Sequence, residues 1–178
     1  MIIEFGGKKP KIHPTAFIAP NATVVGDVEI GEGSSVWFGA VIRADTGKIR
    51  IGRFCSVQDN CVLHAETEEK GGETRHYDVL IGDYVTVGHG AVVHGCKVED
   101  RCVIGANSSV FNEAVVGSGS TVGTGAVVPH GTKIAPFSIV AGVPAKLLKT
   151  VGEAEAAQNR HHAEGYAKLA AEYKKLLG

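Results

Sequence analysis

Aliphatic residues return at every sixth position over most of this chain. The period is unbroken from residue 98 onward, at Val98, Ile104, Val110, Val116, Val122, Val128, Ile134 and Val140. The same spacing runs through residues 12–42 and resumes over residues 51–63 and 81–93. A period of six matches neither an α-helix, whose period is 3.6, nor a long strand, whose period is 2. It predicts short strands joined by tight turns, with three hexapeptides in one triangular coil and the aliphatic side chains inside the prism.

Small side chains stand four positions after many of these aliphatic residues, and glycine often follows the aliphatic residue directly. Glycine permits the backbone geometry that a sharp corner requires. Cys55, Cys61 and Cys102 occupy the small-residue position, which indicates that they lie in the core. The chain has four cysteines and no C-x-x-C pair, so we expect reduced thiols rather than disulfides.

The glycine-rich repeat ends near residue 146, and residues 153–177 have the Ala, Glu, Lys and Leu content of a helix. Tyr166, Leu169, Ala170, Tyr173 and Leu177 recur at helical spacing and predict an apolar stripe that packs on a flat face of the prism. We therefore expect two units, a β-helix domain over residues 1–148 and a C-terminal helix over residues 149–178.

Charge and hydropathy exclude several classes of partner. Lys and Arg number 18 against 19 Asp and Glu, and no long block of one sign occurs, so a nucleic acid partner is not expected. The N-terminus lacks the basic start and apolar stretch of a secretory signal. No apolar run approaches the roughly 18 residues of a membrane-spanning helix. We expect a cytoplasmic protein with no membrane partner.

Counting the hexapeptides into coils aligns Arg43, His64 and His94 in one column on an edge of the prism, with neighbouring rungs about 4.7–4.9 Å apart. Two imidazoles one rung apart can share a metal ion. The same count places Asp59 beside His89 in a different column. We infer that His64 and His94 come from one subunit and His89 from its neighbour, which gives three metal sites in a cyclic trimer. The other histidines are interpreted as polar edge residues: His13, His76, His130, His161 and His162.

Three segments resemble the motif blocks of the γ-class carbonic anhydrases. They are Val-Ile-Arg-Ala-Asp at residues 41–45, Val-Gln-Asp-Asn-Cys-Val-Leu-His at 57–64, and the two-histidine segment at 87–96. The hexapeptide repeats of residues 10–146 resemble those of the left-handed β-helix superfamily. The resemblance implies an all-β fold with a C-terminal helix, built as a left-handed parallel β-helix. The left hand comes from the resemblance alone, because parallel crossovers are generally right-handed.

The resemblance also implies a site and a reaction. It makes His64, His89 and His94 the metal ligands, with Zn²⁺ as the expected ion and Fe²⁺ or Co²⁺ as alternatives that imidazoles also accept. The implied reaction is the reversible hydration of carbon dioxide to bicarbonate by metal-bound hydroxide at the interfaces of a homotrimer. The other implied site residues are Arg43, Asp45 and Asp59 in an intersubunit salt-bridge network, Gln58 orienting the bound water, and Tyr166 lining the site.

Residues 65–78 are expected to leave the prism as a loop, whose glutamates and His76 are candidate proton acceptors. Thr46 and Thr67 stand where the active branch of the family has acidic residues, and Phe111 is expected to form an apolar wall beyond His94. The two threonines favour one alternative function, a non-catalytic metal-binding or assembly homologue. A second alternative is a hexapeptide-repeat acyltransferase, which uses a histidine base and needs no metal.

Overall fold

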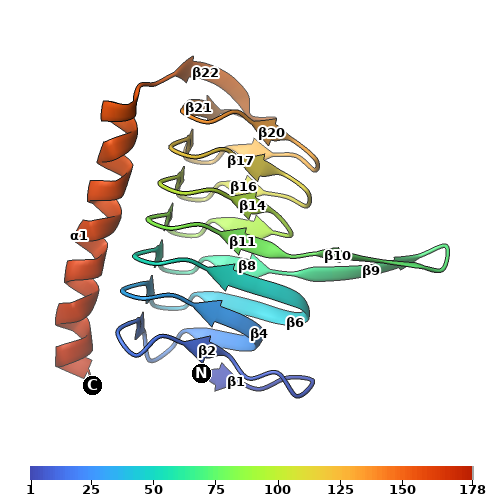
Figure 1. Cartoon of the computed structure of the whole chain (residues 1–178), viewed down its shortest axis with the longest axis vertical. Coiled ribbons are helices and arrows are strands. Elements are labelled where there is room, and N and C mark those ends of the chain that lie inside the picture. The colour runs from blue at the N-terminus through green and yellow to red at the C-terminus, as the bar shows by residue number, and fades with distance from the viewer. Residues whose placement is uncertain (178) are drawn as a thin grey trace.

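The computed structural model describes residues 1–177, which form a three-sided prism of stacked coils with one long helix along its side (Figure 1). Strands of each coil pair in parallel with the coils above and below. The predicted left-handed parallel β-helix with a C-terminal helix is confirmed. The elements are β1 (Ile2–Ile3), β2 (Lys11–Ile12), β3 (Phe17–Ile18), β4 (Thr23–Ile30), β5 (Ser35–Val36), β6 (Val41–Ile51), β7 (Ser56–Val57), β8 (Val62–His64), β9 (Glu66–Lys70), β10 (Glu73–Tyr77), β11 (Val79–Ile81), β12 (Thr86–Val87), β13 (Val92–His94), β14 (Lys97–Val98), β15 (Val103–Ile104), β16 (Ser109–Val110), β17 (Val115–Val116), β18 (Thr121–Val122), β19 (Val127–Val128), β20 (Lys133–Ile134), β21 (Ser138–Ala141), β22 (Lys146–Thr150) and α1 (Glu153–Leu177).

The prism has three faces. The histidine face consists of the first halves of β4 and β6 followed by β8, β13, β16 and β19. The charged face consists of β2, the second halves of β4 and β6, and then β11, β14, β17 and β20. The helix face consists of β3, β5, β7, β12, β15, β18 and β21, and α1 lies against it. Because β4 and β6 run around a corner, the first two faces form one continuous sheet.

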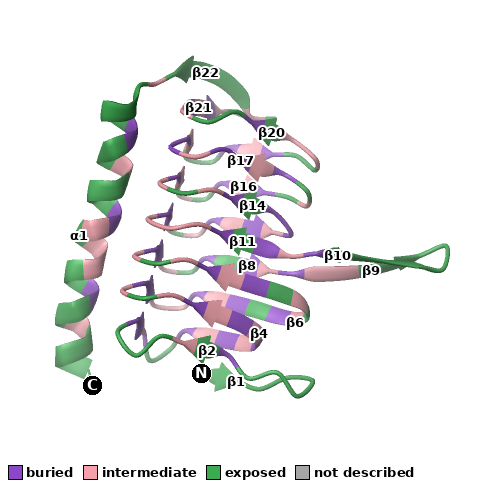
Figure 2. Cartoon of the chain, in the orientation of Figure 1, coloured by how far each residue is buried: buried purple, intermediate pink, exposed green. Residues whose placement is uncertain are grey.

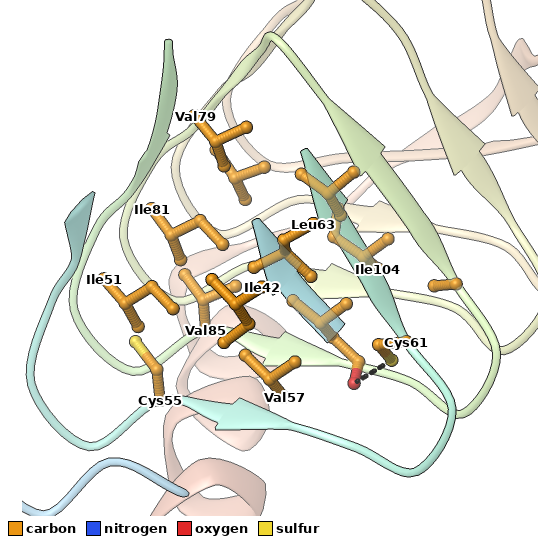
Figure 3. Packing of buried hydrophobic residues seen from close by; sticks show 14 of the residues in the cluster. Ile42, Ile51, Cys55, Val57, Cys61, Leu63, Val79, Ile81, Val85 and Ile104 are labelled. Carbon is orange, nitrogen blue, oxygen red and sulfur yellow. Dashed lines mark hydrogen bonds between the residues drawn. The ribbon is translucent and has the colours of Figure 1, made fainter. Parts of the chain in front are cut away.

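The repeated aliphatic residues fill the interior, as their period predicts (Figures 2 and 3). Ile42, Leu63 and Val93 lie on successive rungs of the histidine face and are fully buried. All four cysteines are buried and free, so the expectation of reduced core thiols is confirmed, and Cys96 joins the three predicted ones. Burial raises the pKa of three of these thiols to about 12 and that of Cys61 to about 11.

Corners of the prism carry residues with positive φ, and not all of them are glycine. Phe54 and Tyr84 adopt φ of 54° and 58°, a conformation that is uncommon for bulky side chains. Their rings stack with centroids 5.3 Å apart. The guanidinium of Arg160 on α1 lies 4.6 Å from the centre of the Tyr84 ring. This stack attaches the helix to one corner of the prism.

The helix packs through its small residues. Ala156, Ala163 and Ala170, spaced seven apart, are buried against the helix face. The half-buried rings of Tyr166 and Tyr173 pack against the core, as the apolar stripe predicts. The same stripe was wrong for two leucines, Leu169 and Leu177, which are 40% and 49% exposed. The close approach of α1 to the sheet accounts for this difference, because it leaves room for alanine along the contact line and displaces larger side chains to its flanks.

The segment after His64 is a β-hairpin and not the expected loop. Strands β9 and β10 pair antiparallel over five residue pairs and project from the prism (Figure 1). Gly71 and Gly72 join them with φ of 62° and 82°, and a two-residue hairpin turn of this type needs positive φ at both positions. The glycine pair was the sequence signal for this hairpin.

The C-terminal end of the prism is closed by β22, which pairs antiparallel with β21. The expected boundary after residue 148 falls inside this strand, and α1 begins at Glu153. We retain the division into residues 1–148 and 149–178 as a proposal, with Gly178 outside the described residues. Within residues 1–177 no helix has the length and apolar character that crossing a membrane requires.

Candidate metal centre

His64 and His94 face each other across one rung of the histidine face. Their Cα atoms are register partners in β8 and β13, and Arg43 is the partner of His64 on the other side. The column predicted from the hexapeptide count is therefore present. Nδ1 of His64 lies 2.9 Å from Nε2 of His94.

Both rings are held from the side away from this contact. Nε2 of His64 lies 3.3 Å from Oδ1 of Asp45, and Nδ1 of His94 lies 2.5 Å from Oδ1 of Asn112. The amide nitrogen of Asn112 donates to Oε2 of Glu66, which fixes the amide oxygen toward His94. Since the two oxygens can only accept, each imidazole carries its proton on the outer nitrogen. The facing nitrogens of the neutral rings then each present a lone pair.

His89 lies in another column, as the sequence predicts. Its Nδ1 lies 2.8 Å from Oδ2 of Asp59, which leaves the lone pair of Nε2 directed elsewhere. The backbone N–H of His89 donates to Oε1 of Gln58 at 3.1 Å, and Gln58 is only 3% exposed. Asp59 and Gln58 thus position His89. Asp59 makes this contact within one chain.

Arg43 and Asp45 form an ion pair beside His64, so part of the predicted network is present within one chain. The pKa of Asp45 lies below its usual value. Burial acts to raise it, but the hydrogen bonds from Arg43, His64 and the backbone outweigh burial. Burial also lowers the pKa of His64, and the charge of Arg43 acts in the same direction. The neutral imidazole, which is the form that binds metals, is therefore favoured at His64.

Tyr166 extends from α1 toward the prism and lies in an aromatic cluster. Its ring is 5.8 Å from that of Trp37 and 5.2 Å from that of His162. Burial raises the pKa of Tyr166, and the charge of Asp59 adds to this effect. The phenol is therefore a neutral donor on the Asp59 and His89 side of the prism, away from the His64 and His94 pair.

The two threonines at the acidic positions of the family pattern bond to each other. The hydroxyl of Thr67 donates to the carbonyl of Thr46, and the Thr67 N–H donates to the Thr46 hydroxyl at 3.2 Å. Nδ1 of His76 lies 2.9 Å from the Thr67 hydroxyl. These contacts fix the base of the hairpin.

Asn112 is the residue that the sequence analysis missed. It follows Phe111, which the rung count places one rung beyond His94, so the count could have located it beside the metal column. Phe111 is partly exposed and lines a hollow beside His94, in agreement with the expected apolar wall.

The three imidazoles fit a metal ion of the zinc type. Each has one nitrogen held by an oxygen acceptor and one with a free lone pair, the arrangement that metal-binding histidines have. Two ligands at 2.0–2.1 Å from a tetrahedral ion lie roughly 3.3 Å apart, so the pair at 2.9 Å must open by a few tenths of an ångström. Within residues 1–177 of one chain, no three His, Cys, Asp or Glu side chains converge on one point for a metal.

Comparison with known proteins places the chain among the hexapeptide-repeat proteins. The model described as bacterial transferase hexapeptide (six repeats) matches residues 9–44 and 78–112, and the hexapeptide repeat of succinyl-transferase matches residues 96–130. A solved structure from Anaplasma phagocytophilum, described as a hexapeptide transferase family protein, superimposes with a TM-score of 0.88 at 35% identity. The match covers 97% of this chain and 98% of that one.

Two curated relatives define the family more narrowly. The "Probable carbonic anhydrase" of Methanocaldococcus jannaschii is 49% identical over 85% of this chain and 91% of its own length. The "Gamma carbonic anhydrase 3, mitochondrial" of Arabidopsis thaliana is 43% identical over 96% of this chain and 70% of its own length. The chain belongs to the γ-class carbonic anhydrase family.

Proposed function

We propose that this chain is a γ-type carbonic anhydrase that catalyses the reversible hydration of carbon dioxide to bicarbonate at metal sites between the subunits of a homotrimer. One observation carries the proposal: three imidazoles each have one nitrogen held by Asp45, Asn112 or Asp59 and the other free to bind a metal. The names of the curated relatives support the choice of substrate.

The properties of the three faces support a trimer. The helix face is covered by α1. The charged face presents Lys11, Glu29 and Arg50 in adjacent rungs, linked by ion pairs. The histidine face instead presents an uncovered and mostly apolar outer column of Thr23, Val41, Val62, Val92, Ser109 and Val127. Such a face is suited to contact a second copy of the chain, and burying it would bring the histidine column to a subunit boundary.

A shared site also accounts for the separation of the ligands. His64 and His94 lie at one edge of the histidine face, while His89 stands in the turn before β13, at its opposite edge. In a ring of three subunits, the edge of one prism that carries His64 and His94 can meet the edge of the next prism that carries His89. Three equivalent sites result.

When bound, a zinc-type ion would supply a nucleophile at neutral pH by lowering the pKa of water to about 7. His64, His89 and His94 would hold the ion, and the oxygens that fix their outer nitrogens would keep them in the required tautomers. The side-chain carbonyl of Gln58 accepts from the backbone N–H of His89. The side-chain amide nitrogen of Gln58 is therefore the group that would orient substrate or water. Phe111 offers an apolar wall that suits uncharged carbon dioxide.

The test is stopped-flow hydration of carbon dioxide by protein loaded with zinc, or with iron under anaerobic conditions. We expect kcat/KM within the usual enzymatic range of about 10⁴–10⁸ M⁻¹s⁻¹. His89→Ala should lose both metal and turnover. His13→Ala is the matched control, because His13 is an exposed histidine that bonds to Thr15 at the start of the prism and should retain both.

Other outcomes would identify the alternative functions. Bound metal without turnover in the unaltered protein would indicate a non-catalytic metal-binding homologue. A trimer that binds no zinc or iron would contradict the proposal and favour the acyltransferase alternative.

A further inference from the structure

The hollow beside His94 is lined by a second imidazole. Its lining consists of Glu66, His94, Phe111, Asn112, Val127, Pro129 and His130. Phe111 and Pro129 follow the paired strands β16 and β19, so they continue the column of His94 over the next two rungs. His130 comes directly after Pro129. Two rungs correspond to roughly 10 Å, which a short chain of water molecules spans.

Asn112 lines the same hollow but cannot take part in proton transfer. Its carbonyl oxygen accepts from His94, and its amide nitrogen donates to Glu66. An amide is also neither acid nor base near neutral pH. It therefore orients His94, and the proton that hydration releases must leave by another group.

His130 has the geometry of a proton acceptor. Its Nε2 lies 3.1 Å from Oε2 of Glu113. Since the carboxylate can only accept, the imidazole proton is on Nε2, and Nδ1 has a free lone pair. The side chain is 59% exposed in the single chain, and it stands in the turn after β19, outside the column that the proposed trimer would bury, so it can exchange protons with buffer.

The groups around His130 support a transient positive charge. Glu113 is fixed by Arg75 at 3.6 Å, and Lys133 donates to the backbone carbonyl of Glu113 at 2.6 Å. The ring of Tyr77 lies 6.4 Å from that of His130. Glu113 thus remains beside the imidazole when it becomes charged.

We propose that His130 accepts the proton released in the hydration reaction and passes it to solvent, an inference that rests on the proposed function. Carbon dioxide and water yield bicarbonate and one proton. Water molecules in the hollow deliver that proton to Nδ1 of His130, which becomes an imidazolium ion beside Glu113. A buffer base then removes it and restores the neutral ring.

His76 provides a matched control. It is also an exposed histidine on this side of the prism, but its Nδ1 bonds to Thr67 and its side chain lines a different hollow, with Tyr77 and Lys97. The candidates from sequence were the glutamates of residues 65–78 and His76. Glu66 lines the hollow with His94, but its carboxylate already accepts from Asn112. Of the two histidines the structure favours His130, because it lines the hollow that a predicted metal ligand also lines, whereas His76 lines another.

The experiment compares zinc-loaded His130→Ala and His76→Ala with the unaltered protein. At low buffer concentration, His130→Ala should lower kcat by about tenfold or more, with kcat/KM unchanged, because proton removal limits kcat. Added imidazole should restore kcat. Isotope exchange between ¹⁸O-labelled carbon dioxide and bicarbonate at equilibrium should be unchanged, while release of the label to water should slow. Zinc content and trimer mass should equal those of the unaltered protein, and His76→Ala should match that protein in every assay.

Three results would overturn the inference. They are an unchanged kcat in His130→Ala, a joint loss of kcat and zinc that imidazole does not rescue, and a selective loss of kcat in His76→Ala. Absence of hydration by the unaltered, zinc-loaded protein would overturn the proposed function and this inference together. An active parent with an unaffected His130→Ala variant would overturn the inference alone.

Discussion

Nδ1 of His64 and Nε2 of His94 face each other at 2.9 Å although the two residues are 30 positions apart in the chain. Strands β8 and β13 are adjacent rungs, and the hairpin between them adds residues without changing the register. The outer nitrogens bond to Asp45 and Asn112. Two unprotonated nitrogens at this separation repel each other, and a cation bound between them would remove that repulsion, which supports the proposed metal site.

Asn112→Ala should weaken metal binding without unfolding the prism. The amide oxygen of Asn112 fixes the tautomer of His94, and loss of such a support typically costs 10–100-fold in metal affinity. Zinc affinity is measured by competition with a chelator. Asn21→Ala is the control, since the Asn21 side chain accepts from Gly39 in the first coils. Equal zinc affinity in the two variants would contradict the role of Asn112.

Arg43→Ala should loosen the trimer. Arg43 pairs with Asp45 at the edge of the histidine face, which we propose meets the neighbouring subunit, and truncating a charge pair that an interface buries costs about 2–5 kcal/mol. Sedimentation over a dilution series should show dissociation at tenfold or more higher protein concentration than for the parent. Arg53→Ala is the control, because Arg53 pairs with Asp83 at another corner. A trimer of undiminished stability in Arg43→Ala would refute the interface role.

Gly95→Ala should disturb the site through backbone and contact together. Gly95 has φ of 54°, and an added Cβ would lie 2.6 Å from Oδ1 of Asn112 and 2.6 Å from Cβ of Tyr77. We expect a loss of about 1–3 kcal/mol in the free energy of unfolding, together with weaker zinc binding. Urea denaturation and zinc competition measure the two effects. Gly125→Ala separates them, since Gly125 also has positive φ but an added Cβ there contacts nothing within 4 Å. Equal zinc affinities in both variants would show that the contact of the added Cβ with Asn112 does not affect zinc binding.

The cysteines should be inert in the folded protein. Burial raises the pKa of Cys55, Cys96 and Cys102 to about 12. The reactive thiolate therefore stays scarce in the folded state as pH rises from 7 to 10, whereas thiols of the unfolded chain ionise near pH 8.5. Reaction with a disulfide reagent at pH 8 should be slow in buffer and fast in denaturant. Rapid modification of the native protein would show an exposed thiol.

The repeat made much of the fold predictable, because residue spacing alone aligns successive rungs. It placed Arg43, His64 and His94 in one column and Asp59 beside His89, and the register agrees. Side-chain contacts between rungs do not follow from spacing. Asn112 was missed for that reason, since its amide reaches back one rung to His94.

Other features depend on packing distance. The apolar stripe of α1 predicted contact through Leu169 and Leu177 as well as Ala170, but the helix lies so close to the sheet that alanines make the contact and both leucines are exposed. The positive φ of Phe54 and Tyr84 carries no glycine signal in the sequence and becomes visible only in their stacked corner.

The most direct test of the central claim is zinc content in mixed trimers. His64→Ala and His89→Ala chains are unfolded together, mixed in equal amounts and refolded. If His89 completes the site of a neighbouring subunit, neither variant alone binds zinc, but each mixed trimer has one intact site. Random mixing then restores about a quarter of the parent's zinc. No recovery in mixed trimers of the correct mass would contradict the shared site.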